Sequence, residues 1–258
     1  MANKIYFTEV VLLTKSYNLQ DFKDWLHWHL DIIGFDHAHI FDNESSVDIK
    51  TVCDSYGDKV EYEFIKDTKG QYPLYDDYIN NKSKAWWVLP IDDDEYLYMK
   101  NFDNVNDMLL HYQGKWSDMN KLSIRWKNMF PDDPHAIREN KSLIEFCKND
   151  NERWAELFDG GNKPVKTFVN TRIKINHKVA SPINHAHNPL ASDNQKSYMC
   201  NGDRLYGSWY FGNGDEDLRI LHFQYKSEKE WINKCLNRKP PCGGYNYKRF
   251  VDIPNKMK

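Results

Sequence analysis

The sequence lacks any apolar run of the roughly 18–20 residues that a membrane-spanning helix needs. Its first residues, Met1 to Ile5, lead directly into a strand-like segment and contain no signal-peptide hydrophobic region. Only five cysteines are present, and none forms a Cys-x-x-Cys pair. We therefore expect no integral membrane segment, no disulfide framework and no zinc knuckle. A reduced cytoplasmic setting, in a microbial cell or a virus-infected host cell, is the simplest expectation.

An excess of one charge is also missing, because the formal net charge is only -3. This balance argues against a nucleic-acid partner that binds by phosphate neutralisation. The phosphate-binding patterns Gly-x-Gly-x-x-Gly and Gly-x-x-x-x-Gly-Lys are absent as well. The 258 residues are 40% hydrophobic and 15% aromatic, a composition that excludes a disordered chain. That length fits one large domain, or one domain with a small appendage.

Strand-like and helix-like segments alternate through the first hundred residues. We predict strands at 5–13, 35–41, 60–65 and 86–91, and helices at 19–33, 46–56 and 73–84. Such alternation predicts an α/β fold with a mainly parallel sheet flanked by helices. Beyond residue 100 the pattern loosens. There we expect helices at 105–112, 145–158 and 227–236, strands at 122–129 and 219–225, and two short strands within 165–179.

Acidic residues follow two of the predicted strands. Asp42 ends the second strand, and Asp92, Asp93 and Asp94 follow the fourth. In a parallel sheet, ligands bind at the carboxyl ends of the strands. Residues i and i+2 of a strand share a face, so we expect Asp92 and Asp94 to converge on one cation and Asp93 to point away. Two carboxylates and substrate phosphate oxygens suit Mn²⁺ or Mg²⁺. The alternative is a solvated acidic turn.

The acidic run carries a resemblance to a known family. The segment Ile91-Asp92-Asp93-Asp94-Glu95-Tyr96-Leu97 resembles the DXD motif of GT-A glycosyltransferases, and is most similar to family-2-like and family-92-like enzymes. Three further segments resemble theirs: 24–37, around Trp25 and His29; 40–45, Ile-Phe-Asp-Asn-Glu-Ser; and 221–234, around His222 and Lys226. After Trp126, which is retained, the sequence departs from the family's pattern, because Lys127-Asn128-Met129-Phe130-Pro131 replaces the usual Phe-Gly pair.

The resemblance implies a single GT-A-like domain over 1–258, with a Rossmann-like nucleotide-sugar half at 1–100 and an acceptor-binding half with a C-terminal lid at 101–258. Asp42 is then expected to contact the uracil-type base or the ribose, with Asn43 beside it. Asp94 is expected to hold the metal. Asp92 is expected to contact the ribose or the metal, and Asp93 is grouped with the donor-binding residues. The alternative for Asp42 is a turn residue that closes its strand.

Histidines and a lysine of the later segments complete the predicted donor site. GT-A enzymes often add a late histidine to the metal, and His185, His187 and His222 qualify by position. A histidine ligand favours Mn²⁺ over Mg²⁺. Lys226 is expected to reach the β-phosphate of the donor and stabilise the leaving group. The alternative for each histidine is a packed or surface residue, and the alternative for Lys226 is a solvated lysine at the end of a strand.

A carboxylate is needed to deprotonate the acceptor hydroxyl if the reaction inverts the anomeric centre, as the resemblance suggests. Asp132 and Asp133 follow the Trp126 strand, where family-2-like enzymes place a catalytic acid. Pro131-Asp132-Asp133-Pro134 also reads as a turn. Glu152 and Glu156 are the reserve candidates for the carboxylate that deprotonates the acceptor.

Aromatic and basic residues of the second half suggest how the acceptor and the diphosphate are held. Sugar rings pack on aromatic faces, and four tryptophans fall in this half: Trp116, Trp126, Trp154 and Trp209. We expect Trp126 or Trp209 to line the acceptor groove, although packing in the core is the alternative for each. Four basic residues flank a Pro/Gly segment near the end of the chain and either close over the diphosphate as a lid or form a basic tail without that role: Arg238, Lys239, Lys248 and Arg249.

These observations together predict a metal-dependent glycosyltransferase. It would move a sugar from a nucleotide-sugar donor to a carbohydrate or glycoprotein-glycan acceptor. UDP is the preferred nucleotide, and GDP stays open. Two other classes also fit parts of the pattern. A metal-dependent nucleotidyltransferase shares the clustered carboxylates, and a non-catalytic carbohydrate-binding protein shares the aromatic residues.

Overall fold

The computed structural model describes residues 5–66, 70–158, 161–173, 197–207, 209–212, 217–237 and 252–258. The chain forms two compact units. The first contains residues 1–126 and 163–220, and the second contains residues 127–162 and 221–258.

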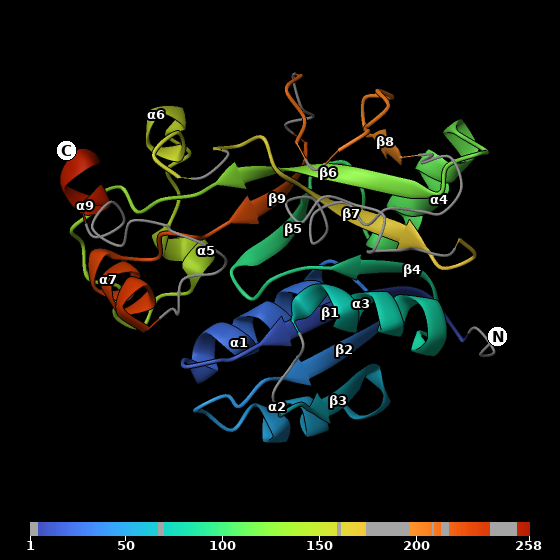
Figure 1. Cartoon of the computed structure of the whole chain (residues 1–258), viewed down its shortest axis with the longest axis horizontal. Coiled ribbons are helices and arrows are strands. Elements are labelled where there is room, and N and C mark those ends of the chain that lie inside the picture. The colour runs from blue at the N-terminus through green and yellow to red at the C-terminus, as the bar shows by residue number, and fades with distance from the viewer. Residues whose placement is uncertain are drawn as a thin grey trace. The chain divides into compact units, whose positions relative to one another are not determined.

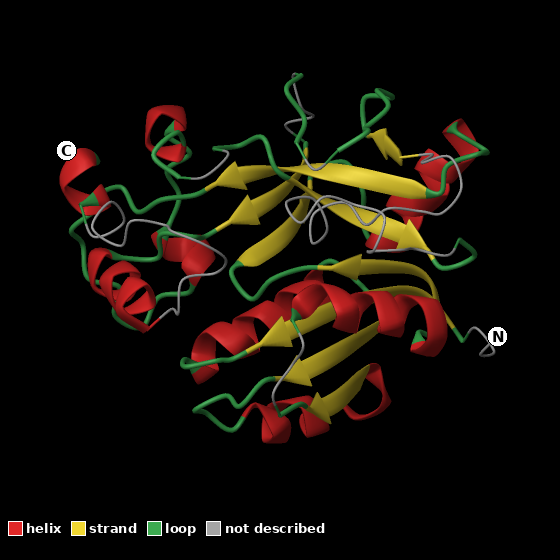
Figure 2. Cartoon of the chain, in the orientation of Figure 1, coloured by secondary structure: helices red, strands yellow, loops and turns green. Residues whose placement is uncertain are grey.

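The first unit is built on four parallel strands in the order β3-β2-β1-β4 (Figure 1). The strands are β1 (Tyr6–Thr14), β2 (His37–Asp42), β3 (Val60–Phe64) and β4 (Ala85–Pro90). Helices α1 (Leu19–His27), α2 (Ile49–Ser55) and α3 (Gln71–Asp77) connect them (Figure 2). A short 3-10 turn, Gly57–Lys59, precedes β3. The predicted α/β class, with a mainly parallel, helix-flanked sheet in this half, is confirmed.

The strand order reverses between β1 and β4. The chain adds β2 and β3 on one side of β1 and then returns to place β4 on the other side. In open α/β sheets such a reversal opens a crevice at the carboxyl ends of the two central strands, and ligands bind there. Any ligand site of this sheet is therefore expected beyond Thr14 and Pro90.

Five further strands extend the sheet, in the order β7-β6-β9-β5 beyond β4, with β8 beside β6. They are β7 (Val165–Asn170), antiparallel to β4; β6 (Lys121–Asn128), antiparallel to β7; β8 (Ser197–Met199), parallel to β6; β9 (Leu218–His222); and β5 (Glu95–Met99). Helix α4 (Val105–Lys115) lies between β5 and β6 in the sequence. Because β7 is antiparallel to β4, its first residues lie beside the carboxyl end of β4.

Two of the connecting helices are extended by π-helical turns. Asn18 caps α1 by accepting from the backbone N–H groups of Gln20 and Asp21, and the helix continues as a π-helix over Trp28–Ile32. Helix α3 continues in the same way over Tyr78–Lys82. The indole of Trp25 donates to the carbonyls of Asp92 and Glu95, both at 3.1 Å, which ties α1 to the start of β5.

A buried cluster fixes α3 and its extension on one face of the parallel sheet. It joins Tyr75, Tyr78 and Ile79 to side chains of β1, β2 and β4: Val11, Phe41, Ala85 and Val88. Since alternate residues of a strand face opposite ways, Thr8 lies on the other face. Its hydroxyl donates to Asn106 of α4 at 2.7 Å.

The second unit is mainly short helices around an aromatic core. The helices are α5 (Leu143–Phe146), α6 (Glu152–Ala155), α7 (Glu228–Asn237) and α9 (Ile253–Lys256). Phe130, Phe158, Tyr225 and Trp231 form the centre of the cluster. Ser227 opens α7 with the predicted capping interaction, because its Oγ accepts from the N–H of Glu230 at 3.3 Å and donates to that carboxylate at 2.6 Å.

The single helix predicted over 145–158 was wrong. The chain leaves the helical conformation after Phe146, and Asn149 forms an antiparallel bridge with Phe130. Helix α6 then starts anew, with Asn151 accepting from the N–H of Trp154 at 3.1 Å. Asn and Asp side chains readily hydrogen-bond to nearby backbone groups, so the segment Asn149-Asp150-Asn151 favours caps and turns over a continuous helix.

Among the described residues, no helix combines the length and apolarity that crossing a bilayer would require. None of the four described cysteines forms a disulfide: Cys53, Cys147, Cys200 and Cys235.

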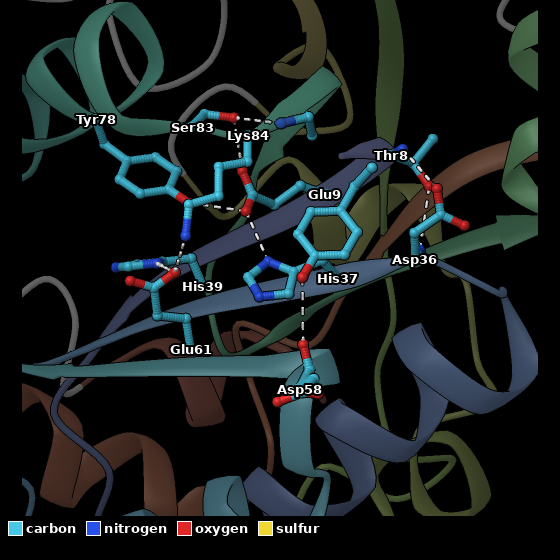
Figure 3. Close-up of polar contacts among 12 residues, drawn as sticks. Thr8, Glu9, Asp36, His37, His39, Asp58, Glu61, Tyr78, Ser83 and Lys84 are labelled. Atoms are coloured by element: carbon cyan, nitrogen blue, oxygen red, sulfur yellow. Dashed lines mark hydrogen bonds and ion pairs between the residues drawn. The ribbon is translucent and has the colours of Figure 1, made fainter. Parts of the chain in front are cut away.

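A buried polar network lies on the face of the sheet that α3 covers, toward the amino end of β2 (Figure 3). Glu9 is fully buried and accepts hydrogen bonds from Tyr78 and His37, at 2.8 and 2.7 Å, through Oε1. Its Oε2 accepts from Ser83 at 2.8 Å. Both carboxylate oxygens are therefore satisfied by β2, the π-helical turn and Ser83, which caps that turn. This network lies away from the carboxyl ends of the strands and serves the fold.

His39, next to this network, makes the stability of the fold sensitive to acid. It is 2% exposed, and neither ring nitrogen has a hydrogen-bond partner among the described residues. The nearest carboxylates are exposed ones, Glu63 at 3.5 Å and Glu61 at 3.8 Å. Burial, aided by the positive charges of His37, Lys82 and Lys84, lowers the pKa of His39 from 6.5 to about 3.

We expect His39→Leu to flatten the dependence of stability on pH. The neutral imidazole stabilises the fold fully above pH 6.5, and this contribution is lost as the pH falls from 6.5 toward 3, by up to about 1.4 kcal/mol per pH unit. Urea denaturation of both proteins at pH 7, 6 and 5 measures the difference in slope. His27→Leu, at an exposed histidine, is the control and should keep the slope of the wild type. Parallel curves for wild type and His39→Leu would contradict this account.

Candidate functional site

Three strands bring their carboxyl ends to the crevice. Thr14 of β1 lies opposite Asp42 of β2, and Val11 of β1 lies opposite Pro90 of β4. The acidic run therefore leaves β4 next to Thr14, whose hydroxyl donates to Asp93 Oδ2 at 2.7 Å. The predicted donor-binding residues of the two segments thus lie at one edge of the sheet, at the strand-order reversal.

Asp42 is held in place from two sides. Its Oδ2 accepts from the Tyr62 hydroxyl at 2.8 Å, and its Oδ1 accepts from the N–H of Ser45, also at 2.8 Å. The second contact is the turn-closing bond that the sequence offered as the alternative for this residue. Asn43 follows, and its N–H donates to the carbonyl of Thr14 at 2.8 Å. These bonds fix the Asp42 carboxylate at the sheet edge.

Asp92 contacts a buried lysine that also contacts a buried glutamate. The ammonium of Lys166, in β7, lies 2.8 Å from Asp92 Oδ2 and 3.1 Å from Glu95 Oε2. Gln71 of α3 donates to Asp92 Oδ1 at 2.7 Å. The side chains of Lys166 and Glu95 are 1% and 0% exposed, whereas Asp92 keeps 34%. Asp92 is thus the exposed end of a network whose other end is in the core.

The charges of this network shift its pKa values in different directions. Burial raises the pKa of Glu95 to about 8, although Lys166 opposes the shift. Burial alone would lower the pKa of Lys166, but the carboxylates of Asp92 and Glu95 outweigh it and raise this pKa above its usual range. Burial also acts to raise the pKa of Asp92, and the charge of Lys166 lowers it overall. Lys166 and Asp92 are therefore the permanently charged pair at neutral pH.

Asp94 is the most enclosed residue of the acidic run, at 6% exposure, and its charge acts on both Asp92 and Glu95. No group of three or more His, Cys, Asp or Glu side chains arranged to hold a metal occurs among the described residues. Mg²⁺-type cations are commonly held by only one or two carboxylates together with substrate phosphates and water. Asp92 and Asp94 fit that kind of shared site, although both oxygens of Asp92 already accept protein hydrogen bonds. Asp93, which we expected to point away from Asp92 and Asp94, bonds to Thr14.

The other predicted site residues with described positions belong to the second unit. Asp132 and Asp133 are exposed, and Asp133 closes the predicted turn by accepting from the N–H of His135 at 2.9 Å. His222 is buried and ends β9, and the half-buried Lys226 follows it. His185 and His187 lie outside the described residues, as do the lid residues Arg238, Lys239, Lys248 and Arg249. The catalytic and metal roles of all these residues stay predictions.

The predicted acceptor tryptophans have different surroundings. Trp116 is stacked between Tyr112 and Tyr198, with centroids 5.3 and 4.9 Å away. Trp126 is buried, and Trp154 packs edge-on against a phenylalanine of the second unit's core. Trp209 is 37% exposed, the largest exposure among these four.

Sequence reasoning did not find Lys166, Gln71 or Thr14, which hold the acidic run in place. One signal for Lys166 was available. It stands in Val-Lys-Thr-Phe-Val, a strand pattern in which a buried lysine requires a buried partner. That partner lies 74 positions away, at Asp92. Only the antiparallel placement of β7 beside β4 brings the two together.

No protein-family model matches the sequence, and no curated protein matches it. Among solved structures, residues 1–349 of TarS from S. aureus match 96% of this chain and 70% of that chain, at 11% identity and a TM-score of 0.43. The same fragment in complex with UDP-GlcNAc matches 97% and 71%, at 12% identity and a TM-score of 0.40. The 4-diphosphocytidyl-2C-methyl-D-erythritol synthase of Anaerococcus prevotii matches 65% and 71%, at 11% identity and a TM-score of 0.36. These similarities are too distant to assign a family or an activity.

Proposed function

We propose that this protein is a glycosyltransferase that uses a nucleotide-sugar, preferably a UDP-sugar, as its donor. One observation carries the proposal. The acidic run Asp92–Asp94 and the carboxylate of Asp42 lie together at the reversal of strand order, where an open α/β sheet binds its ligand. The resemblance of 91–97 to the DXD motif supports the same reaction class.

Each residue of this edge has a proposed task. Asp42, with Asn43 beside it, binds the base or the ribose of the donor. Asp94 and Asp92 hold Mn²⁺ or Mg²⁺, which when bound supplies a positive charge to the departing diphosphate. Gln71 and Lys166 keep the Asp92 carboxylate in one orientation. Thr14 does the same for Asp93.

The remaining roles rest on the resemblance. Asp132 or Asp133 takes the proton from the acceptor hydroxyl in an inverting transfer, with Glu152 and Glu156 in reserve. Lys226 stabilises the leaving diphosphate, and a histidine among His185, His187 and His222 completes the metal site. The acceptor is a carbohydrate or a glycan of a glycoprotein. A cytoplasmic location belongs to the same proposal.

Thermal unfolding with a panel of UDP- and GDP-sugars tests the proposal. Each nucleotide is added with Mn²⁺ and with EDTA to the wild type. A ligand that binds only the folded state, at about a hundred times its Kd, stabilises it by roughly 2.7 kcal/mol. We expect a shift with UDP-sugars that needs Mn²⁺. Absence of any shift at millimolar nucleotide would contradict the proposal. Release of inorganic diphosphate in place of UDP would identify a nucleotidyltransferase.

A further inference from the structure

Three large aromatic side chains are exposed within six residues of the first unit. Tyr206, Trp209 and Phe211 are 78%, 37% and 72% exposed. The rings of Trp209 and Phe211 lie with their centroids 6.2 Å apart, and the ammonium of Lys163 lies 5.5 Å from the centroid of Phe211. We call Tyr206, Trp209 and Phe211 the aromatic patch. Burying an aromatic side chain is strongly favourable in water, so a dense exposed group of them indicates a binding surface.

The segment that carries the patch is anchored from behind. Tyr210, between the two exposed rings, is buried in a cluster with Val165, Met199 and Leu205. Its hydroxyl bonds to Asn201, at 2.7 Å, and to Asp203. Trp209 and Phe211 are therefore held outward by an inward-facing neighbour.

The end of the segment is also fixed. The guanidinium of Arg125 donates to the carbonyl of Gly212 at 2.9 Å. A side chain at Gly212 would collide with the Tyr210 hydroxyl, so the close approach of the two requires glycine. The contacts of Tyr210 and Gly212 therefore fix the segment that carries the aromatic patch.

The backbone of this segment runs beside the start of β7. Tyr210 N–H donates to the carbonyl of Lys163 at 2.8 Å, whereas the next carbonyl, that of Pro164, accepts from Trp126 of β6 at 2.9 Å. Successive carbonyls of a strand point to opposite edges. The segment therefore lies along the edge of β7 that faces away from β6. Farther along β7, this same edge is paired with β4. The segment thus follows β4 along this edge, beyond Pro90, where β4 ends.

The patch is thereby continuous with the candidate donor site. Trp209 forms an antiparallel bridge with Pro164, so the two side chains share a face. Pro164 shares that face with Lys166, two residues and about 7 Å along the strand. Lys166 is the residue whose ammonium contacts Asp92. An extended ligand on Trp209 and Phe211 therefore begins at the same edge of the sheet as the acidic run.

We propose that the aromatic patch binds the acceptor, and that the acceptor is an oligosaccharide whose ring faces stack on Trp209 and Phe211. Sugar rings present apolar C–H faces that pack on aromatic rings, whereas the hydroxyl rims stay in water. This inference rests on the proposed glycosyltransferase function and names the substrate class of its second site.

A printed array of defined oligosaccharides tests the inference. Fluorescently labelled wild-type protein is applied with UDP and Mn²⁺, beside the double variant Trp209→Ala/Phe211→Ala. Leu110→Ala, at another exposed apolar side chain on α4 with 55% exposure, is the matched control. We expect the wild type and the control to bind a common set of glycans, and the double variant to lose at least about tenfold in signal. All three should keep the same affinity for UDP in solution.

The other outcomes separate this inference from the proposed function. Equal glycan signals for wild type and double variant would overturn the inference. So would UDP binding without any glycan binding by the wild type, which leaves the donor site standing. Loss of a dimer in the double variant, measured by sedimentation with glycan binding unchanged, would show that a second copy covers the patch. Absence of both UDP and glycan binding would overturn the inference and the proposed function together.

Discussion

Replacing Lys166 by methionine is expected to lower the free energy of unfolding by about 1–3 kcal/mol at pH 7, because it removes the only cation that contacts Asp92 and Glu95 among the described residues. The cost arises mainly at Asp92, whose carboxylate is charged at neutral pH and whose 34% exposure lets water screen part of the loss. Glu95 adds less, because burial raises its pKa to about 8 and so keeps it mostly protonated at pH 7. Urea denaturation measures the loss.

Two further variants make this expectation specific to the buried charges. Lys163→Met removes an exposed lysine three residues earlier and is expected to cost less than about 1 kcal/mol. Lys166→Met combined with Asp92→Asn is expected to recover part of the loss, because the second substitution removes the carboxylate left without its cation. The deficit of Lys166→Met should also shrink from pH 7 to pH 5, as the Asp92 carboxylate, without its cation, takes up a proton. A loss below 1 kcal/mol at pH 7 would show that the pair of Lys166 and Asp92 does not stabilise the acidic run.

Asp94→Asn is expected to reduce donor turnover by about a hundredfold or more, with little effect on stability. The substitution keeps the shape of the side chain and removes the charge that, in the proposed function, holds the metal. Metal assistance supplies several kcal/mol of stabilisation to a developing anion, and each 1.36 kcal/mol is a factor of ten in rate. Release of UDP from the UDP-sugar that stabilises the wild type most is the measurement.

Asp54→Asn provides the matched control for this rate. Asp54 is an exposed carboxylate on α2 that pairs with Lys50 four positions earlier, and its replacement should leave turnover unchanged. If Asp94→Asn kept more than a third of the wild-type rate, Asp94 would not be a metal ligand.

The parallel half of the fold was predictable because its signals are local. Each of the four strands β1 to β4 was predicted within two residues of its observed bounds, and the helix cap at Asn18 marked the start of α1 correctly. Buried parallel strands read as continuous apolar runs, and the helices between them have their own period. Nothing comparable marked β5, which follows the acidic run and was not predicted. Glu95–Met99 ends the strand order beside β9, and such long-range pairing leaves no trace in a short segment.

The residues of the candidate site were likewise predictable where their signals are local, and not where they depend on long-range pairing. Asp42 and the acidic run were found because strand ends and carboxylates are both visible in the sequence. The bond between Asp93 and Thr14 was not predicted, because the chain turns over 93–94 and the bonding partner comes from β1. The supporting residues Lys166 and Gln71 come from other elements, and only the folded sheet brings them to Asp92.

A crystal structure of the protein with UDP and Mn²⁺ is the most direct test of the central claim, that the carboxyl ends of β1, β2 and β4 form a nucleotide-sugar site. We expect the uracil or the ribose beside Asp42, and an anomalous peak for Mn²⁺ between the diphosphate and Asp94. UDP bound at any other place on the chain, or a Mn²⁺ peak that contacts neither Asp92 nor Asp94, would contradict the claim.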